Sequence, residues 1–174
     1  MKKIVIIILI IIISISMFKI QKEDTIIIPD NALRLRIIPN SNSAIDQNMK
    51  LKVKEYLENN TYTLIKDEVS LDDARKIIKD NIPSIKKNIE KIFDEDNYDM
   101  SYTVNYGYNY FPKKEYKGIK YNEGYYESIV ISIGKAEGDN WWCVLFPNLC
   151  LVDLKKTNNI EYRSWIIEKI NKII

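Results

Sequence analysis

The chain has 174 residues, with 26 basic and 24 acidic side chains and no histidine. Without an imidazole, one chain cannot supply the proton acceptor of Ser-His-Asp or Cys-His catalysis, and its two cysteines are too few for a zinc site built from cysteine and histidine. Its five glycines form no phosphate-binding loop, and the near balance of charge argues against nucleic-acid binding. We therefore predict no enzyme activity, catalytic residue, cofactor, metal, small-molecule substrate or nucleic-acid partner.

The N-terminus has the pattern of an export signal. Lys2 and Lys3 precede an unbroken aliphatic run, and small residues that suit a cleavage site follow it. The apolar segment 4–18 is shorter than the roughly 20 residues of a membrane-spanning helix, but an uncleaved anchor stays open. We predict three parts: residues 1–20 as signal peptide or N-terminal anchor, 21–30 as connector, and 31–174 as a single domain outside the membrane.

The domain begins with a strand and a helix. Alternation from Leu33 to Ile38 predicts the strand, which Pro39 and the residue after it terminate. Ser43 and Asp46 resemble a capping box, and the apolar residues that follow recur at helical spacing. The first helix is therefore expected at about 44–59.

A second helical region follows a polar connection. Ser70 and Asp73 repeat the capping pattern, and a stripe of isoleucines extends the helix over about 71–94. Pro83 lies inside this region, where its ring and missing donor either kink the helix or divide it.

After residue 100 the period changes from that of a helix to that of a strand. Tyrosines share one parity from 102 to 110, and we expect this aromatic side to face the helices. Strands are expected at 102–110, 125–133 and 141–146, a lysine-rich loop at 113–120, and an amphipathic helix at 160–174. The predicted class is α+β: a strand, two helices, a three-strand meander and a C-terminal helix, with the helices on one face of a mostly antiparallel sheet.

Two acidic clusters have structural explanations. The pair Asp72 and Asp73 lies in the first turn of a helix, where the helix dipole favours negative charge, and the run 94–96 belongs to a solvated connector. A calcium loop from Asp94 lacks the required glycine and glutamate. The lysine-rich loop suits a solvated hairpin tip, with contact to anionic lipid as the alternative.

The two cysteines, Cys143 and Cys150, flank a turn at Pro147 and Asn148. In an exported domain this spacing favours a disulfide, although a two-residue turn would place Cys150 opposite Leu145, so the bridge needs a wider loop or a bulge. The alternative is that both are small buried side chains.

Two motifs of this chain resemble the stage II sporulation protein R family. The first motif runs from Leu33 to Ser43 and continues through Asp46-Gln47 to residues 51–54. The second motif runs from Asn140 to Asp153 and contains Trp-Trp-Cys-Val-Leu-Phe-Pro-Asn-Leu-Cys. Between them, Asn81-Ile82-Pro83 resembles the middle of the family's sequence. The resemblance covers about 33–153 and the last helix.

The chain departs from the family's pattern at several positions. Arg36 stands where many members carry histidine, and alanine, aspartate and a second proline are replaced by Pro39, Asn42 and Asn148. Since no imidazole is present, the Arg36 position favours recognition over chemistry.

The resemblance implies a signalling function during spore formation. Such a protein is exported from the forespore into the space between the two membranes, where it activates a membrane-embedded aspartic protease of the mother cell, and that protease processes the precursor of sigma factor E. Two alternatives remain: a membrane-tethered structural or binding module, and a secreted hydrolase that uses carboxylates.

The expected partner-binding residues lie in the two motifs. Arg34, Arg36, Asn40 and Asn42 surround the end of the first strand and the loop after it, although turn and cap chemistry explains the loop residues equally well. Trp141 and Trp142 are of a type enriched at interface hot spots, and as neighbours in a strand they point to opposite faces.

Overall fold

The structure is a computed structural model that describes residues 26–27, 30–61, 64–65, 70–116 and 119–146. The segments predicted as export signal and C-terminal helix lie outside these residues. No helix among the described residues is long and apolar enough to span a membrane. The elements are β1 (Ile26–Ile27), β2 (Leu33–Ile38), α2 (Ala44–Tyr56), the π-helical turn η1 (Leu57–Thr61), α3 (Leu71–Glu95), β3 (Tyr102–Phe111), β4 (Lys114–Tyr116), β5 (Ile119–Tyr121), β6 (Gly124–Ile133) and β7 (Trp141–Phe146).

The main sheet has four strands in the order β3-β6-β2-β7. The pairs β3–β6 and β2–β7 are antiparallel, whereas β2 and β6 run parallel. The α+β class with a mostly antiparallel sheet is thus confirmed, but β7 pairs with β2 and not with β6 as a meander would require. The turn after β6 passes over the end of β2, where Gly138 N–H donates to the Pro39 carbonyl (3.1 Å), and so delivers β7 to the far side of β2.

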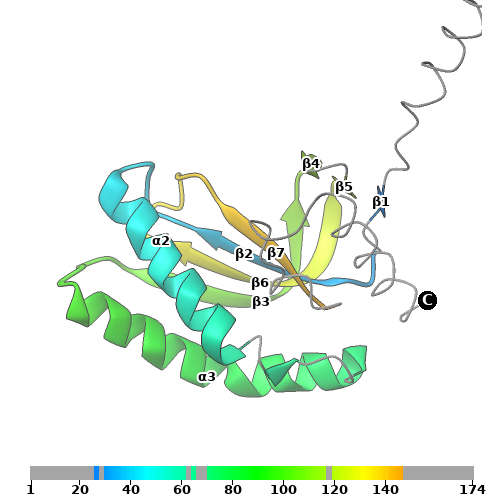
Figure 1. The fold of residues 1–174 in the computed structure, drawn as a ribbon, viewed down its shortest axis with the longest axis horizontal. Coiled ribbons are helices and arrows are strands. Elements are labelled where there is room, and N and C mark those ends of the chain that lie inside the picture. Colours follow the sequence, from blue (N-terminus) through cyan, green and yellow to red (C-terminus); the bar gives the residue numbers. More distant parts are fainter. Residues whose placement is uncertain (1–25, 28–29, 62–63, 66–69, 117–118, 147–174) are drawn as a thin grey trace, which may run out of the picture.

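The lysine-rich stretch predicted as a loop contains a hairpin. β4 and β5 pair antiparallel, and β5 pairs parallel with β1, which gives a separate three-stranded sheet. Figure 1 shows this small sheet near the end of the main sheet where β2 begins.

The capping signals place both helices correctly. Ser43 accepts a hydrogen bond from the Asp46 N–H at the start of α2, and Ser70 and Asp73 form a complete capping box at the start of α3. α2 ends three residues before the predicted position and continues as the π-helical turn. α3 runs as one helix through Pro83, so the proline does not divide it.

Both helices cover one face of the main sheet (Figure 1). The core joins this face to apolar residues of α2 and α3 and includes Leu33, Leu35 and Ile37 of β2. On β3, Tyr102, Val104 and Tyr106 pack against the core as predicted. Tyr108 and Tyr110 do not, since they are 72% and 49% exposed, and the predicted aromatic inner face therefore holds only for the first half of the strand.

Candidate functional site

The two faces of β2 differ in chemistry. Its odd-numbered residues are buried in the core beneath the helices, so the alternation of a strand turns Arg34 and Arg36 toward the opposite face, which no described helix covers. Around the two arginines lie aromatic and basic side chains from four other strands. We call this set the cationic-aromatic face: Arg34, Arg36, Phe111, Lys114, Tyr126 and Trp142.

Arg34 is almost completely buried, with 1% of its surface exposed. Its guanidinium carbon lies 3.3 Å from the centre of the Tyr126 ring and 5.6 Å from that of Phe111. Among the described residues, none of its three guanidinium nitrogens has a hydrogen-bond acceptor. Burial lowers the pKa of Arg34 because the charged form loses hydration, and the neighbouring Tyr126 only partly opposes this effect. A buried cation without an acceptor is rare, because an unpaired buried charge is costly.

Arg36 is held in a more accessible position. When the Asn140 amide is oriented so that its nitrogen donates to the Gly138 carbonyl (2.9 Å), its oxygen accepts from Arg36 Nε (3.0 Å) and Nη2 (2.7 Å). The guanidinium also lies 5.5 Å from the centre of the Trp142 ring, and burial lowers the pKa of Arg36. Asn140 therefore fixes the direction of a cation that has no carboxylate partner among the described residues.

Trp142 is the aromatic centre of the accessible part of this face. Lys114 Nζ lies 4.7 Å from the centre of its ring, and Phe111 meets it edge-on at 5.5 Å. Trp141 points to the other face and packs against the core, with Lys54 Nζ 5.3 Å from its ring centre. The structure thus places Trp142 beside Arg36, with Phe111 between Trp142 and Arg34 as a shared neighbour, and separates Trp141 from both arginines.

Asn40 and Asn42 hold two loops together. Asn40 Oδ1 accepts from the Lys135 N–H (3.0 Å), and Asn42 Oδ1 accepts from the Asp139 N–H (2.6 Å), so both side chains bind the turn between β6 and β7. We predicted both asparagines as partner-binding residues, with turn chemistry as the alternative. The structure shows the turn contacts of that alternative.

The Asn40 loop is built around a buried carboxylate that the sequence indicated only as a helix cap. Asp46 Oδ2 accepts from Asn40 Nδ2 (2.9 Å) and Ser41 Oγ (2.5 Å), and Oδ1 accepts from the Tyr98 hydroxyl (2.6 Å). The Ser41 bond and the Tyr98 bond lower the pKa of Asp46 to about 2. Asp46 therefore joins the first motif to the connection between α3 and β3.

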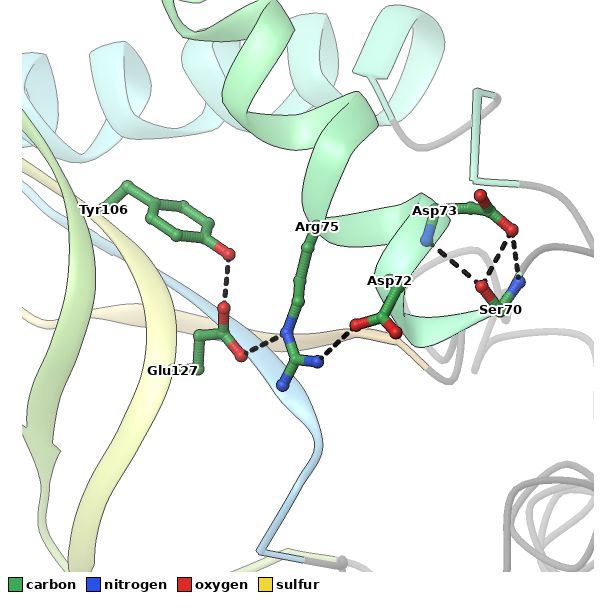
Figure 2. Close-up of polar contacts among 6 residues, drawn as sticks. All are labelled: Ser70, Asp72, Asp73, Arg75, Tyr106 and Glu127. Carbon is green, nitrogen blue, oxygen red and sulfur yellow. Dashed lines mark hydrogen bonds and ion pairs between the residues drawn. The ribbon is translucent and has the colours of Figure 1, made fainter.

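The acidic pair at the start of α3 is engaged in helix structure, as Figure 2 shows. Asp73 accepts from the Ser70 hydroxyl (2.7 Å) and the Ser70 N–H (3.3 Å), whereas Asp72 pairs with Arg75 (2.7 Å). This agrees with the prediction that these carboxylates serve the helix terminus.

Arg75 extends this network to the sheet. Its Nε donates to Glu127 of β6 (2.7 Å), whose other oxygen accepts from the Tyr106 hydroxyl (2.5 Å) (Figure 2). The bond to Glu127 and the bond to Asp72 raise the pKa of Arg75. These contacts attach the start of α3 to the sheet on the helix-covered side, away from the cationic-aromatic face.

The other acidic cluster and two cavities lined by described residues also lie on the helix side. Asp96 pairs with Lys52 of α2 at 2.6 Å. A cavity of about 560 Å³ lies between the end of α3 and the start of β3, and one of about 410 Å³ lies between α2 and α3. In the described part of the chain, no three acidic or cysteine side chains are arranged as metal ligands.

Cys143 faces the core from β7, and Cys150 lies outside the described residues, so the bridge between them stays a prediction. Three members of the site were not predicted as partner-binding residues: Phe111, Lys114 and Tyr126. Asn140, which orients Arg36, was not predicted either. Strand parity alone would have placed Phe111 opposite the tyrosines of β3, but its neighbours depend on the strand order.

Fold and site together define the class: an α+β domain that presents cations and aromatic rings on a sheet face without a described helix above it. Residues 29–156 match the family described as Stage II sporulation protein R. Stage II sporulation protein R of Bacillus subtilis (strain 168) is 37% identical over an alignment of 171 residues, which covers 92% of this chain and 76% of that protein. The chain belongs to the stage II sporulation protein R family, which confirms the resemblance of the two motifs. No solved structure matches it.

Proposed function

We propose that the chain is an exported signalling protein that activates a membrane-embedded aspartic protease of the neighbouring compartment and so triggers processing of the sigma factor E precursor. On this proposal the protein is not an enzyme, and it acts in the space between the forespore and mother-cell membranes. Family membership supports the link to sporulation. The N-terminal sequence pattern supports export.

The observation that carries the recognition role is the cationic-aromatic face. Arg34, Arg36 and Trp142 come from the two family motifs, and the strand order β2-β7 places them side by side. Aromatic and arginine side chains dominate binding energy at protein interfaces. A surface of this composition suits an activating ligand that recognises a partner protein.

The test is deletion of the gene in sporulating cells. We expect the sigma factor E precursor to remain unprocessed, and expression of the chain in the forespore to restore processing. Unchanged processing in the deletion strain would overturn the proposal. Intact mass of the exported protein then decides between a cleaved signal and an anchor at residues 4–18, and a retained anchor would favour the tethered module as the form that acts.

A further inference from the structure

The cationic-aromatic face carries positive charge that its surroundings do not neutralise. Arg34, Arg36 and Lys114 form no ion pair with any acidic side chain of the described residues. The ion pairs of the described residues lie elsewhere, between α2 and its neighbours and at both ends of α3. Among the described residues, these three cations therefore have no ion-pair partner, although the charge of Asp30, without pairing with Arg34, partly opposes the lowering of the Arg34 pKa by burial.

Arg34 contributes to this charge from below the surface. Its nitrogens have no acceptor in the described part of the chain, and Arg34 is almost completely buried beside aromatic rings. Ring contacts compensate a buried guanidinium only in part, because a cation–π contact contributes less than full dehydration costs. Since low-dielectric surroundings screen a charge weakly, Arg34 raises the potential of the face above it.

The accessible part lies at the Trp142 ring. Arg36 is directed by Asn140 and half-buried, whereas Lys114 is exposed on β4. Both cations lie within 5.5 Å of the centre of the same indole ring. An acidic segment that covers that ring would therefore bring its carboxylates close to two cations, one of them already oriented, with Phe111 providing apolar contact for methylene groups.

A membrane surface is a poorer match for this arrangement. Adsorption to anionic lipid uses clusters of about four to eight exposed basic residues. The cationic-aromatic face has three, of which Arg34 is buried. Recognition of a few defined carboxylates needs fewer cations but fixed ones.

We propose that the cationic-aromatic face binds an acidic segment of a partner protein, with a side-chain carboxylate held between Arg36 and Lys114 beside Trp142. This inference rests on the proposed function only in that the partner is a protein to which the chain signals. Beyond the proposed function, it states that the partner's binding segment is acidic, and it names the residues of this chain that bind the segment.

The first experiment measures binding of a defined probe. N-acetylated hexaglutamate amide is titrated into the purified full chain in nonionic detergent while tryptophan fluorescence is recorded, with hexaglutamine as the uncharged comparison. We expect saturable binding of hexaglutamate only, weakened at least about tenfold in the double variant R36Q/K114Q, because each lost charge-assisted contact contributes about 1 kcal/mol or more. The matched control is K86Q/K87Q, which removes two exposed charges from α3 on the other layer and should bind as wild type does.

Equal hexaglutamate affinity in wild type and R36Q/K114Q would overturn the proposal, as would no saturable binding. Flotation with phosphatidylglycerol and phosphatidylcholine vesicles addresses the lipid alternative. Capture by phosphatidylglycerol that R36Q/K114Q abolishes, without hexaglutamate binding, would assign the face to a membrane and refute the acidic segment. Thermal melts of both double variants establish that each remains folded.

The second experiment separates this inference from the proposed function. In the deletion strain, K86Q/K87Q should restore processing of the sigma factor E precursor and R36Q/K114Q should not. Full restoration by R36Q/K114Q would overturn the inference while the signalling function stands. Normal processing in the deletion strain would instead overturn the proposed signalling function. The hexaglutamate titration alone would then decide whether the face binds an acidic segment.

Discussion

The buried carboxylate of Asp46 gives the sharpest stability prediction. In Asp46→Asn, one of the two carboxylate oxygens becomes an amide nitrogen, which cannot accept. Asn40 and Ser41 share one oxygen and Tyr98 uses the other, so at least one donor loses its acceptor. An unsatisfied buried donor costs about 1 to 3 kcal/mol, and the remaining bonds lose their charge.

The lowered pKa of Asp46 expresses the effect of the same hydrogen bonds as a free energy. A carboxyl whose pKa falls from 3.8 to about 2 on folding stabilises the folded state by about 2 kcal/mol at neutral pH. Both routes give a loss of about 2 to 3 kcal/mol for Asp46→Asn, which in a domain of this size lowers Tm by roughly 10 °C. The stabilisation by the Asp46 carboxylate therefore depends on pH. It is complete above about pH 4 and is lost as the pH falls through about 2.

Urea unfolding of the full chain, followed by circular dichroism between pH 7 and pH 2, measures this difference. The control is Asp99→Asn, which removes the same charge from an exposed side chain. We expect the gap between wild type and Asp46→Asn to narrow toward pH 2, while Asp99→Asn stays within about 0.5 kcal/mol of wild type. An Asp46→Asn protein as stable as wild type at pH 7, or a gap independent of pH, would refute the reasoning.

Three further predictions use the same unfolding measurement. Replacing Cys143 and Cys150 by serine should lower stability by about 2.5 kcal/mol if the short loop is bridged, and an unchanged Tm would count against the bridge. Gly138→Ala should destabilise by about 1 to 3 kcal/mol, because the new methyl would collide with the Ser41 carbonyl, whereas Gly107→Ala meets nothing within 4 Å and serves as the control. Arg34→Met should leave stability unchanged or higher, since an apolar side chain of similar length replaces an unpaired buried charge, yet should weaken hexaglutamate binding; a loss above about 2 kcal/mol would instead make Arg34 a structural residue.

Periodicity and caps were enough to predict the elements. The alternation of β2, β3, β6 and β7 and the serine caps of both helices are local signals, and the structure places all six elements within a few residues of the expected positions. The order of the strands is not local. It depends on β2 being buried on both sides and on the turn between β6 and β7 being able to cross its end.

The site was predictable only where strand parity decides it. Parity placed Trp141 and Trp142 on opposite faces. Lys114, however, reaches Trp142 from a hairpin that we predicted as a loop because its sequence is rich in lysine. Likewise, Tyr98 meets Asp46 across 52 residues of sequence. The contact between Tyr98 and Asp46 follows from the packing of α2 beside α3, and no local sequence pattern predicts it.

The first motif can now be divided by what each position does. Leu33, Leu35 and Ile37 fill the core, and the asparagines with Asp46 lock the loop to the next turn, so stability explains all of them. Stability does not explain Arg34 and Arg36, because an apolar strand face would avoid the dehydration that both undergo. A binding function is expected at residues that the fold does not need for stability but that neighbouring structural residues hold rigid. The two arginines are therefore the part of the motif that we assign to recognition.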